Sequence, residues 1–254
     1  ILMCRIIVIL QNQANQKYII DYFLTQSHEK KNTPGSNNNR DFDYHKDGYG
    51  FIFYNDNISF YKSSLMYKDD TNFEFIKNKI IKSNILIGHI RATKYHFKDD
   101  VCYNNTHPFW YKNQFWSHNG SVNPFNSNFY NTYIDNKYKS HIKGKTDSEV
   151  LFYIYMTIFD KLNDEEKSWI EFIQLLDMFY SKYQITISAN IVFSNEKVII
   201  ISRYINNNEE PPSLYIDTNT RIISSEPVTD TFELINRNTT IIYNVKDTTI
   251  RYIV

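Results

Sequence analysis

The stretch CRIIVILQ, residues Cys4–Gln11, is an almost unbroken run of apolar and mostly β-branched side chains near the start of the sequence. Such a run, without polar residues at alternate positions, predicts a β-strand that is covered on both faces. A chain that enters its core this early favours a sheet packed between other layers.

Strand patterns dominate the sequence before residue 91. Gly50–Asn55 and Ile58–Lys62 are separated by two turn-forming residues and predict a hairpin. Phe73–Lys82 has helical spacing, and Ile85–Ile90 is a further apolar strand. Between these elements, Ser27–Lys46 is polar and predicts a long surface loop.

Two longer helices are expected at Asp147–Leu162 and Asp164–Lys182. Each follows a capping signal, which is Thr146 with Glu149 for the first helix and Asn163 with Glu166 for the second. Both helices have wide apolar faces, as expected for helices that lie on a sheet.

Short β-rich runs then predict an antiparallel meander. They are Thr186–Phe193, Lys197–Tyr204, Leu214–Ile216, Arg221–Ser224, Thr240–Val245 and Thr248–Ile253. No linker or repeat divides the sequence, so we expect one domain over residues 4–254, of the α+β class, with two mainly antiparallel sheets packed together and helices outside.

Composition narrows the classes of partner. The 254 residues carry 28 basic and 28 acidic side chains, which leaves no positive excess to bind nucleic acid or a membrane surface. No run reaches the roughly 18 apolar residues that a membrane-spanning helix needs. Two cysteines are too few for a disulfide framework, and Ile1–Leu10 lacks the features of a signal peptide, so a cytoplasmic location is expected.

Cys4 directly follows Met3. If everything before Cys4 is removed, its free α-amino group, with a pKa near ~7.7–8.0, can act as general base for its own thiol. A buried and inert cysteine is the alternative interpretation of this residue alone.

Four further motifs contain candidate site residues. His89–Thr93 (HIRAT) ends a strand with Arg91, which could bind a carboxylate bidentately or form a surface ion pair. Asn119–Gly120, which follows the Asn105–Phe109 motif NTHPF, could supply two donors to an oxyanion or form a tight turn.

Lys145–Glu149 (KTDSE) places Asp147 at a helix start, where it could bind an ammonium group, although a capping box explains the pattern equally well. Asp47–Gly50 (DGYG) indicates either a tight bend or a backbone that closely approaches a ligand.

Taken together and in this order, Met-Cys-Arg, DGYG, HIRAT, NTHPF, HNG and TDSE resemble the glutaminase domain of the class II glutamine amidotransferases. The later segments Ile191–Tyr204 (IVFSNEKVIIISRY) and Ile223–Val228 (ISSEPV) resemble the subfamily that contains the glutathione-degradation subunit of fungi and the γ-glutamyl hydrolase of ergothioneine synthesis.

The resemblance implies the four-layer αββα sandwich of the N-terminal-nucleophile (Ntn) hydrolases. It also implies roles for seven residues. Cys4 would be nucleophile and base, Asn119 and Gly120 the oxyanion hole, Arg91 the partner of the substrate α-carboxylate and Asp147 the partner of its α-ammonium group, with Thr93 and His107 completing the substrate-binding set.

The sequence departs from the family pattern in two places. Ile1 and Leu2 precede Met3, so activity requires either a translation start at Met3 or a processing step. Many relatives have a threonine three positions after the arginine of HIRAT, whereas here Thr93 is two positions after it and Lys94 three.

The resemblance therefore predicts a hydrolase that releases glutamate from glutathione-like γ-glutamyl compounds, with a peptidase or synthase subunit as a candidate partner. The alternatives are a glutaminase subunit that passes ammonia to a partner, and an inactive homologue that binds metabolites. No cofactor and no metal are expected, since His89, His107 and His118 do not have zinc-like spacing with Cys102.

Overall fold

The apolar run at the start of the sequence forms strand β1 (Arg5–Ile9), which is buried along its whole length. Ile6 and Val8 point into one apolar cluster, whereas Ile7 and Ile9 point into another on the opposite face. The prediction of a strand covered on both faces is confirmed, because side chains alternate between the two faces of a strand.

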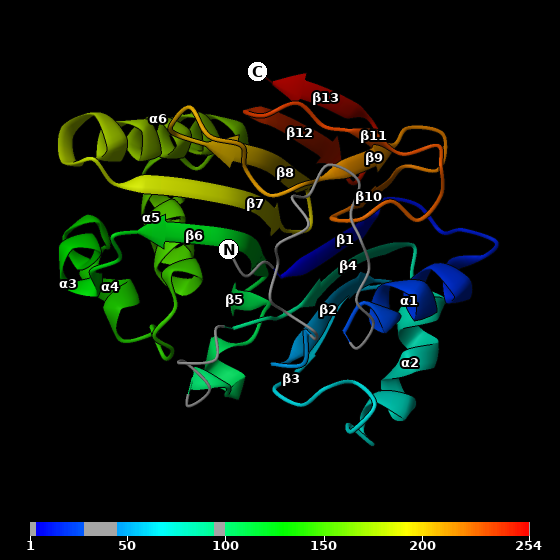
Figure 1. Cartoon of the computed structure of the whole chain (residues 1–254). Helices are drawn as coiled ribbons and strands as arrows, with labels where there is room; N and C mark the ends of the chain where they lie inside the picture. The colour runs from blue at the N-terminus through cyan, green and yellow to red at the C-terminus, as the bar shows by residue number, and fades with distance from the viewer. Residues whose placement is uncertain (1–3, 28–44, 94–99, 254) are drawn as a thin grey trace.

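The computed structural model describes residues 4–27, 45–93 and 100–253. Within these ranges two sheets pack face to face, and all their strand pairs are antiparallel (Figure 1). The seven-stranded sheet has the order β11 (Glu233–Leu234), β9 (Tyr215–Asp217), β10 (Ile222–Ser224), β1, β4 (Ile85–Ile90), β2 (Tyr49–Tyr54) and β3 (Ile58–Ser63). The six-stranded sheet has the order β13 (Ile250–Ile253), β12 (Thr239–Asn244), β8 (Val198–Ile205), β7 (Thr186–Ser194), β6 (Gln114–Asn123) and β5 (Phe109–Tyr111).

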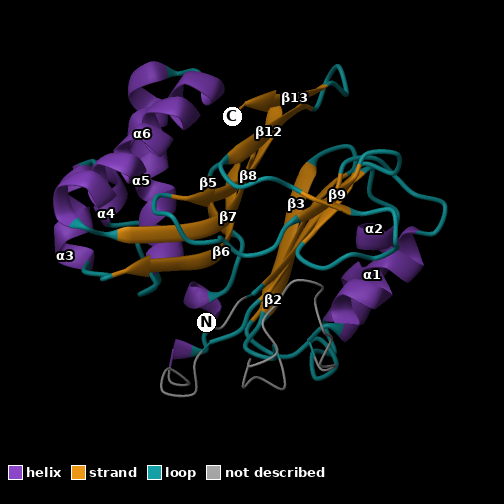
Figure 2. Cartoon of the chain, turned by 45° about the horizontal axis from the view of Figure 1, so that its top comes forward, coloured by secondary structure: helices purple, strands orange, loops and turns teal. Residues whose placement is uncertain are grey.

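Helices cover the outer face of each sheet (Figure 2). Helices α5 (Asp147–Leu162) and α6 (Glu165–Tyr183) lie on the six-stranded sheet, and α1 (Gln16–Thr25) and α2 (Phe73–Ile81) lie on the seven-stranded sheet. Short helices α3 (Ser127–Tyr130) and α4 (Asn136–Lys139) precede α5. Three apolar clusters separate these layers, so the expected αββα sandwich is confirmed.

The predicted meander is wrong. After β8 the chain crosses to the other sheet, adds β9, β10 and β11, and then returns as β12 and β13. Strand β10 pairs with one edge of β1, and β4 pairs with the other. Because β1 is buried, its backbone groups need a hydrogen-bonding neighbour on each side. The hydrophobic pattern of a single run does not identify the strand with which it pairs, because hydrogen-bonded pairing joins segments that are distant in sequence.

The second capping prediction is also wrong. Asp164 caps α6 by accepting a hydrogen bond from the backbone N–H of Lys167 at 2.9 Å. Asn163 instead ends α5 in a left-handed conformation, with φ of 49°. The expected loop Ser27–Lys46 lies almost entirely outside the described residues.

Candidate active site between the sheets

Cys4 lies at the residue before β1, beside the end of β4. The register pairs Arg5 with Ile90, which brings Cys4 next to the segment that follows β4. The backbone N–H of Ala92 lies 3.5 Å from the Cys4 Sγ atom, and the Ala92 carbonyl oxygen lies 3.7 Å from it. The thiol is therefore held by the backbone of the HIRAT motif.

Burial raises the pKa of the Cys4 thiol, which keeps it protonated at neutral pH. The hydrogen bond from Ala92 and the positive charge of Arg91 oppose this shift, while the negative charge of Asp147 adds to it. Two of the predicted substrate-binding charges, of opposite sign, thus lie within electrostatic reach of the sulfur. A thiol in this environment needs a base to become a nucleophile.

The DGYG motif fixes the position of Arg91. The Arg91 N–H donates to the Gly48 carbonyl at 2.8 Å, and the Asp47 N–H donates to the Arg91 carbonyl at 3.2 Å. The Asp47 carboxylate accepts from the Thr93 N–H at 2.7 Å, so both ends of this segment are held. Asp47 was not among the predicted site residues, and its position before two glycines is the only local signal for this role.

The two glycines of DGYG serve the chain's own packing. Gly48 has φ of +112°, and a Cβ atom on Gly50 would lie 2.2 Å from the His107 carbonyl oxygen. The backbone that approaches Gly50 closely is therefore that of the NTHPF motif, which decides between the two interpretations of DGYG.

Asn119 and Gly120 lie in the interior of β6, which excludes the tight turn that was the alternative interpretation of this pair. Strand β5 pairs only with residues 114–116 of β6, so the edge of β6 beyond Trp116 has no strand beside it among the described residues. Because this edge is open, backbone groups of the Asn-Gly sequence can bind a ligand although the sequence lies within a strand.

Alternate residues of β6 direct their backbone groups to that open edge. The His118 carbonyl accepts a hydrogen bond from His89 Nε2 at 3.1 Å, and the Val122 N–H donates to the Asp147 carboxylate at 3.0 Å. Gly120 is two residues from both His118 and Val122, so its N–H also points to the open edge. A Cβ atom on Gly120 would lie 2.0 Å from the Ser188 carbonyl oxygen, which excludes any side chain there.

The Asn119 side chain points into the space between the sheets. Asn119 lies opposite Asn190 on β7, and Asn190 is two residues from Val192, which belongs to the apolar cluster between the sheets. Cys4 is two residues from Ile6, which belongs to the same cluster, so the Cys4 side chain also points between the sheets. Asn119 is only 1% exposed, and its Oδ1 atom has no hydrogen-bond partner among the residues that the structure describes. An unpaired buried polar atom is rare, and the Nδ2 group of the same amide carries two N–H donors that could serve a bound ligand.

Asp147 is the first residue of α5 and connects this helix to β6. One carboxylate oxygen accepts from Val122, and the other accepts from the Ser148 N–H at 2.7 Å. The predicted cap is confirmed, since the Thr146 hydroxyl accepts from the Glu149 N–H at 3.2 Å. The same carboxylate therefore lies at a helix start and at the open edge of β6.

His107 is placed against His89, with ring centroids 3.9 Å apart. Burial lowers the pKa of His107 well below its ordinary value and that of His89 to about 3, so both rings are neutral. Neither ring nitrogen of His107 has a partner among the described residues. Its substrate contact stays a prediction, as does that of Thr93, which is half-buried beside Arg91.

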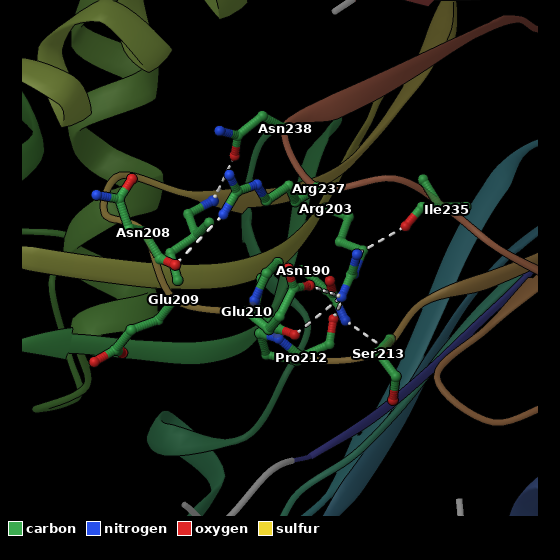
Figure 3. Close-up of polar contacts among 12 residues, drawn as sticks. Asn190, Arg203, Asn208, Glu209, Glu210, Pro212, Ser213, Ile235, Arg237 and Asn238 are labelled. Carbon is green, nitrogen blue, oxygen red and sulfur yellow. Dashed lines mark hydrogen bonds and ion pairs between the residues drawn. The ribbon is translucent and has the colours of Figure 1, made fainter. Parts of the chain in front are cut away.

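A second polar cluster between the sheets, missed by sequence analysis, surrounds Arg203 on β8 (Figure 3). Its guanidinium donates to the carbonyls of Pro212 at 3.0 Å and Ile235 at 2.9 Å, and it pairs with Glu210 at 3.1 Å. The neighbouring Asn190 donates to the Ser213 carbonyl at 2.9 Å. This cluster fastens the loops that connect the two sheets.

Neither a metal site nor a membrane span emerges from the described ranges. Within them, no group of three or more histidine, cysteine or acidic side chains could hold a metal ion. No helix in the same ranges combines the length and apolar character needed to cross a bilayer.

Two antiparallel sheets between helical layers, with a polar edge where the first strand begins, define the fold class of the Ntn hydrolases. The chain belongs to the class-II glutamine amidotransferases, whose family pattern matches residues 34–208, more than half of its length. The matched segment includes Arg91, Asn119, Gly120 and Asp147, and it begins after Cys4.

Among curated proteins, the chain is similar to the probable glutamine amidotransferase DUG3 of Saccharomyces cerevisiae. The two are 23% identical over 225 residues, which cover 77% of this chain and 62% of the yeast protein. This chain therefore matches less than two thirds of the length of that relative.

Solved structures with the same fold include a glutamine aminotransferase class-II domain protein from Silicibacter pomeroyi. It has a TM-score of 0.66 and 18% identity, with 98% of each chain covered. The glutamine phosphoribosylpyrophosphate amidotransferase of B. subtilis has a TM-score of 0.61 and 16% identity over 98% of this chain and 48% of its own.

Proposed function

We propose that the chain is a γ-glutamyl amidohydrolase in which Cys4, freed of Ile1, Leu2 and Met3, is the nucleophile. The carrying observation is the Asn119 side chain, which is buried on β6 and has an unpaired Oδ1 atom, and whose Nδ2 group is the proposed oxyanion donor. A preorganised donor of this kind stabilises an oxyanion without reorganisation during the reaction.

The proposed reaction begins with transfer of the Cys4 thiol proton to its α-amino group. The sulfur attacks the γ-carbonyl carbon, and the resulting oxyanion accepts hydrogen bonds from the Asn119 side chain and the Gly120 N–H. Collapse breaks the C–N bond, and the α-ammonium group returns the proton to the departing amine. Water, deprotonated by the same amine, then hydrolyses the γ-glutamyl thioester to glutamate.

Arg91 and Asp147 are proposed to select the γ-glutamyl group. Their opposite charges both act on the Cys4 sulfur, as the two binding partners of an α-carboxylate and an α-ammonium group should. A guanidinium can hold a carboxylate through two parallel hydrogen bonds. Thr93 and His107 complete the proposed substrate-binding set.

A glutathione-like γ-glutamyl compound is the proposed substrate, with a peptidase or synthase subunit as a candidate partner. The second candidate is a glutaminase that passes ammonia to a partner, and the word amidotransferase in the names of the yeast and B. subtilis proteins supports it.

The test combines N-terminal sequencing of the purified protein with glutamate release from glutathione and from glutamine. We expect Cys4 as the first residue and faster release from glutathione. Preference for glutamine, increased by a partner subunit, would favour the second candidate. A retained Ile1–Met3 segment with no release from either substrate would refute the hydrolase.

A further inference from the structure

A separate pocket of about 340 Å³ lies beside the start of α5. Glu149 lines this pocket, whereas Asp147, two residues earlier, bonds to β6. Residues two apart on an α-helix point in nearly opposite directions, so the pocket and the candidate active site lie on different sides of the same helix start. None of the seven residues proposed above lines it.

Lys62 on β3 supplies the buried charge of this pocket. The residue is 6% exposed, and its Nζ atom donates to the Thr106 carbonyl at 2.8 Å. The rings of Tyr103, Trp110 and Phe109 lie around it, with centroids 4.5, 4.9 and 5.5 Å from Nζ. No carboxylate in the described ranges forms an ion pair with Lys62, so two of its three N–H donors are left for a ligand.

The acidic residue in the pocket is engaged elsewhere. The Glu149 carboxylate accepts hydrogen bonds from the backbone N–H groups of Lys143 at 2.9 Å and Gly144 at 2.7 Å. Lys112 and Lys143 also line the pocket, with exposed side chains. Three lysines against one carboxylate make this pocket attractive to anions.

The remaining walls are aromatic. Trp110 is 39% exposed, and Tyr111 and Tyr153 line the pocket beside it. The exposed ring of Trp110 and the half-buried ring of Tyr111, next to a buried cation, suit a ligand that has both a flat apolar part and a negative charge. We propose that this pocket binds a small organic anion that carries a flat ring, with the anionic group on Lys62 and the ring against Trp110 and Tyr111.

Protonation of Lys62 should control this binding. Burial lowers the pKa of Lys62 to about 8, while the charges of Glu149 and Cys102 oppose the shift. The ammonium form thus predominates at neutral pH and is lost as the pH rises through about 8. The other titratable groups that face Lys62 or the pocket are Tyr103, Tyr111, Lys112, His141, Lys143 and Tyr153.

The test is calorimetric titration of the full chain with benzenesulfonate, whose charge does not change with pH in this range. We expect saturable one-to-one binding, at least about tenfold tighter than that of methanesulfonate, which lacks a ring, and no binding of benzylammonium, which has a ring but a positive charge. Equal binding of either comparison compound would overturn the proposal.

Lys62→Met should weaken benzenesulfonate binding about tenfold or more. Lys182→Met is the matched control, because Lys182 also lies over a ring, that of Tyr183 at 5.2 Å, but does not line this pocket. If Lys62→Met does not fold, the unaltered protein still tests the proposal, since its affinity should fall about tenfold from pH 7 to pH 9. Affinity independent of pH would overturn the proposal whatever the outcome of the glutamate assays.

Discussion

Two buried arginines, Arg91 directly after β4 of the seven-stranded sheet and Arg203 on β8 of the six-stranded sheet, differ in their contacts. Arg203 is 4% exposed and gives its donors to Pro211, Pro212, Ile235 and Glu210. Arg91 is 7% exposed, yet within the described ranges its guanidinium forms one hydrogen bond, to the Asp100 carbonyl at 3.3 Å. A guanidinium has five donors, so Arg203 is satisfied by its own chain and Arg91 is left with donors for a ligand.

Two buried asparagines on neighbouring strands show a similar contrast in their donors. The Oδ1 atoms of Asn119 and Asn190 are both unpaired in the part of the chain that the structure describes, but Asn190 donates from Nδ2 to the Ser213 carbonyl, and Asn119 on the neighbouring strand has no such bond there. Buried polar groups with partners stabilise a fold, and those without partners destabilise it unless a ligand completes them. The comparison therefore separates residues that hold the sheets together from residues that hold a substrate.

Among the predicted changes, Cys4→Ala should have the largest effect on activity. Glutamate release should fall to background, because the proposed nucleophile is gone. Thermal unfolding should change little, since among the described residues the thiol has hydrogen bonds only with the Ala92 backbone. Cys102→Ala is the control and should retain activity, because that cysteine is exposed. Activity in Cys4→Ala would exclude the proposed mechanism.

Asn119→Ala should reduce kcat by ~10²–10³, because one oxyanion donor is lost. The matched change Asn190→Ala should leave kcat unaltered and lower the free energy of unfolding by about 1–2 kcal/mol, since the Ser213 carbonyl loses its donor. Steady-state kinetics and urea unfolding of both variants measure these effects. A comparable loss of kcat in both variants would erase the distinction between the two amides.

Arg91→Lys should raise KM about tenfold to a hundredfold, as expected for loss of ~1.5–3 kcal/mol from a charge-assisted hydrogen bond. Arg203→Lys should instead lower the free energy of unfolding by about 2–3 kcal/mol, with KM unchanged, because buried carbonyls lose donors. Steady-state kinetics and urea unfolding of both arginine variants measure these effects. An unchanged KM in Arg91→Lys would mean that Arg91, like Arg203, is structural.

Glutamate release should fall about tenfold per pH unit below the pKa of the α-amino group, near ~7.7–8.0, because only the neutral amine accepts the thiol proton. Burial raises the pKa of the Cys4 thiol, so a preformed thiolate does not replace the base at low pH. A pH profile of kcat/KM measures the effect. Activity that is flat between pH 6 and 8 would show that another group is the base.

Several elements were predictable because their signals are local. The hairpin β2–β3, strand β4 and helix α5 agree with the expected ranges, since alternation and helical periodicity depend on neighbouring residues. The Thr146 cap is equally local. Motif order also indicated the family, although single motifs such as Asn119–Gly120 had a more ordinary explanation in a turn.

The strand pairing and the site contacts were not predictable in this way. Asp47 holds Thr93 across 46 residues of sequence, and Arg203 holds the Ile235 carbonyl across 32. The open edge of β6 exists because β5 is short, a property of two strands together. Such contacts join distant segments, and no window of sequence contains both partners.

By itself, the sequence determined the class of fold, the position of helices α2, α5 and α6 and the candidate residues, because burial patterns and motifs are local properties of the sequence. Only the tertiary structure decided which strands entered which sheet, which buried polar groups were satisfied and which were left for a ligand. The physical reason is that a hydrogen bond needs two partners, and for Arg91, Asn119 and Arg203 the partner, or its absence, is set by the packing of the two sheets.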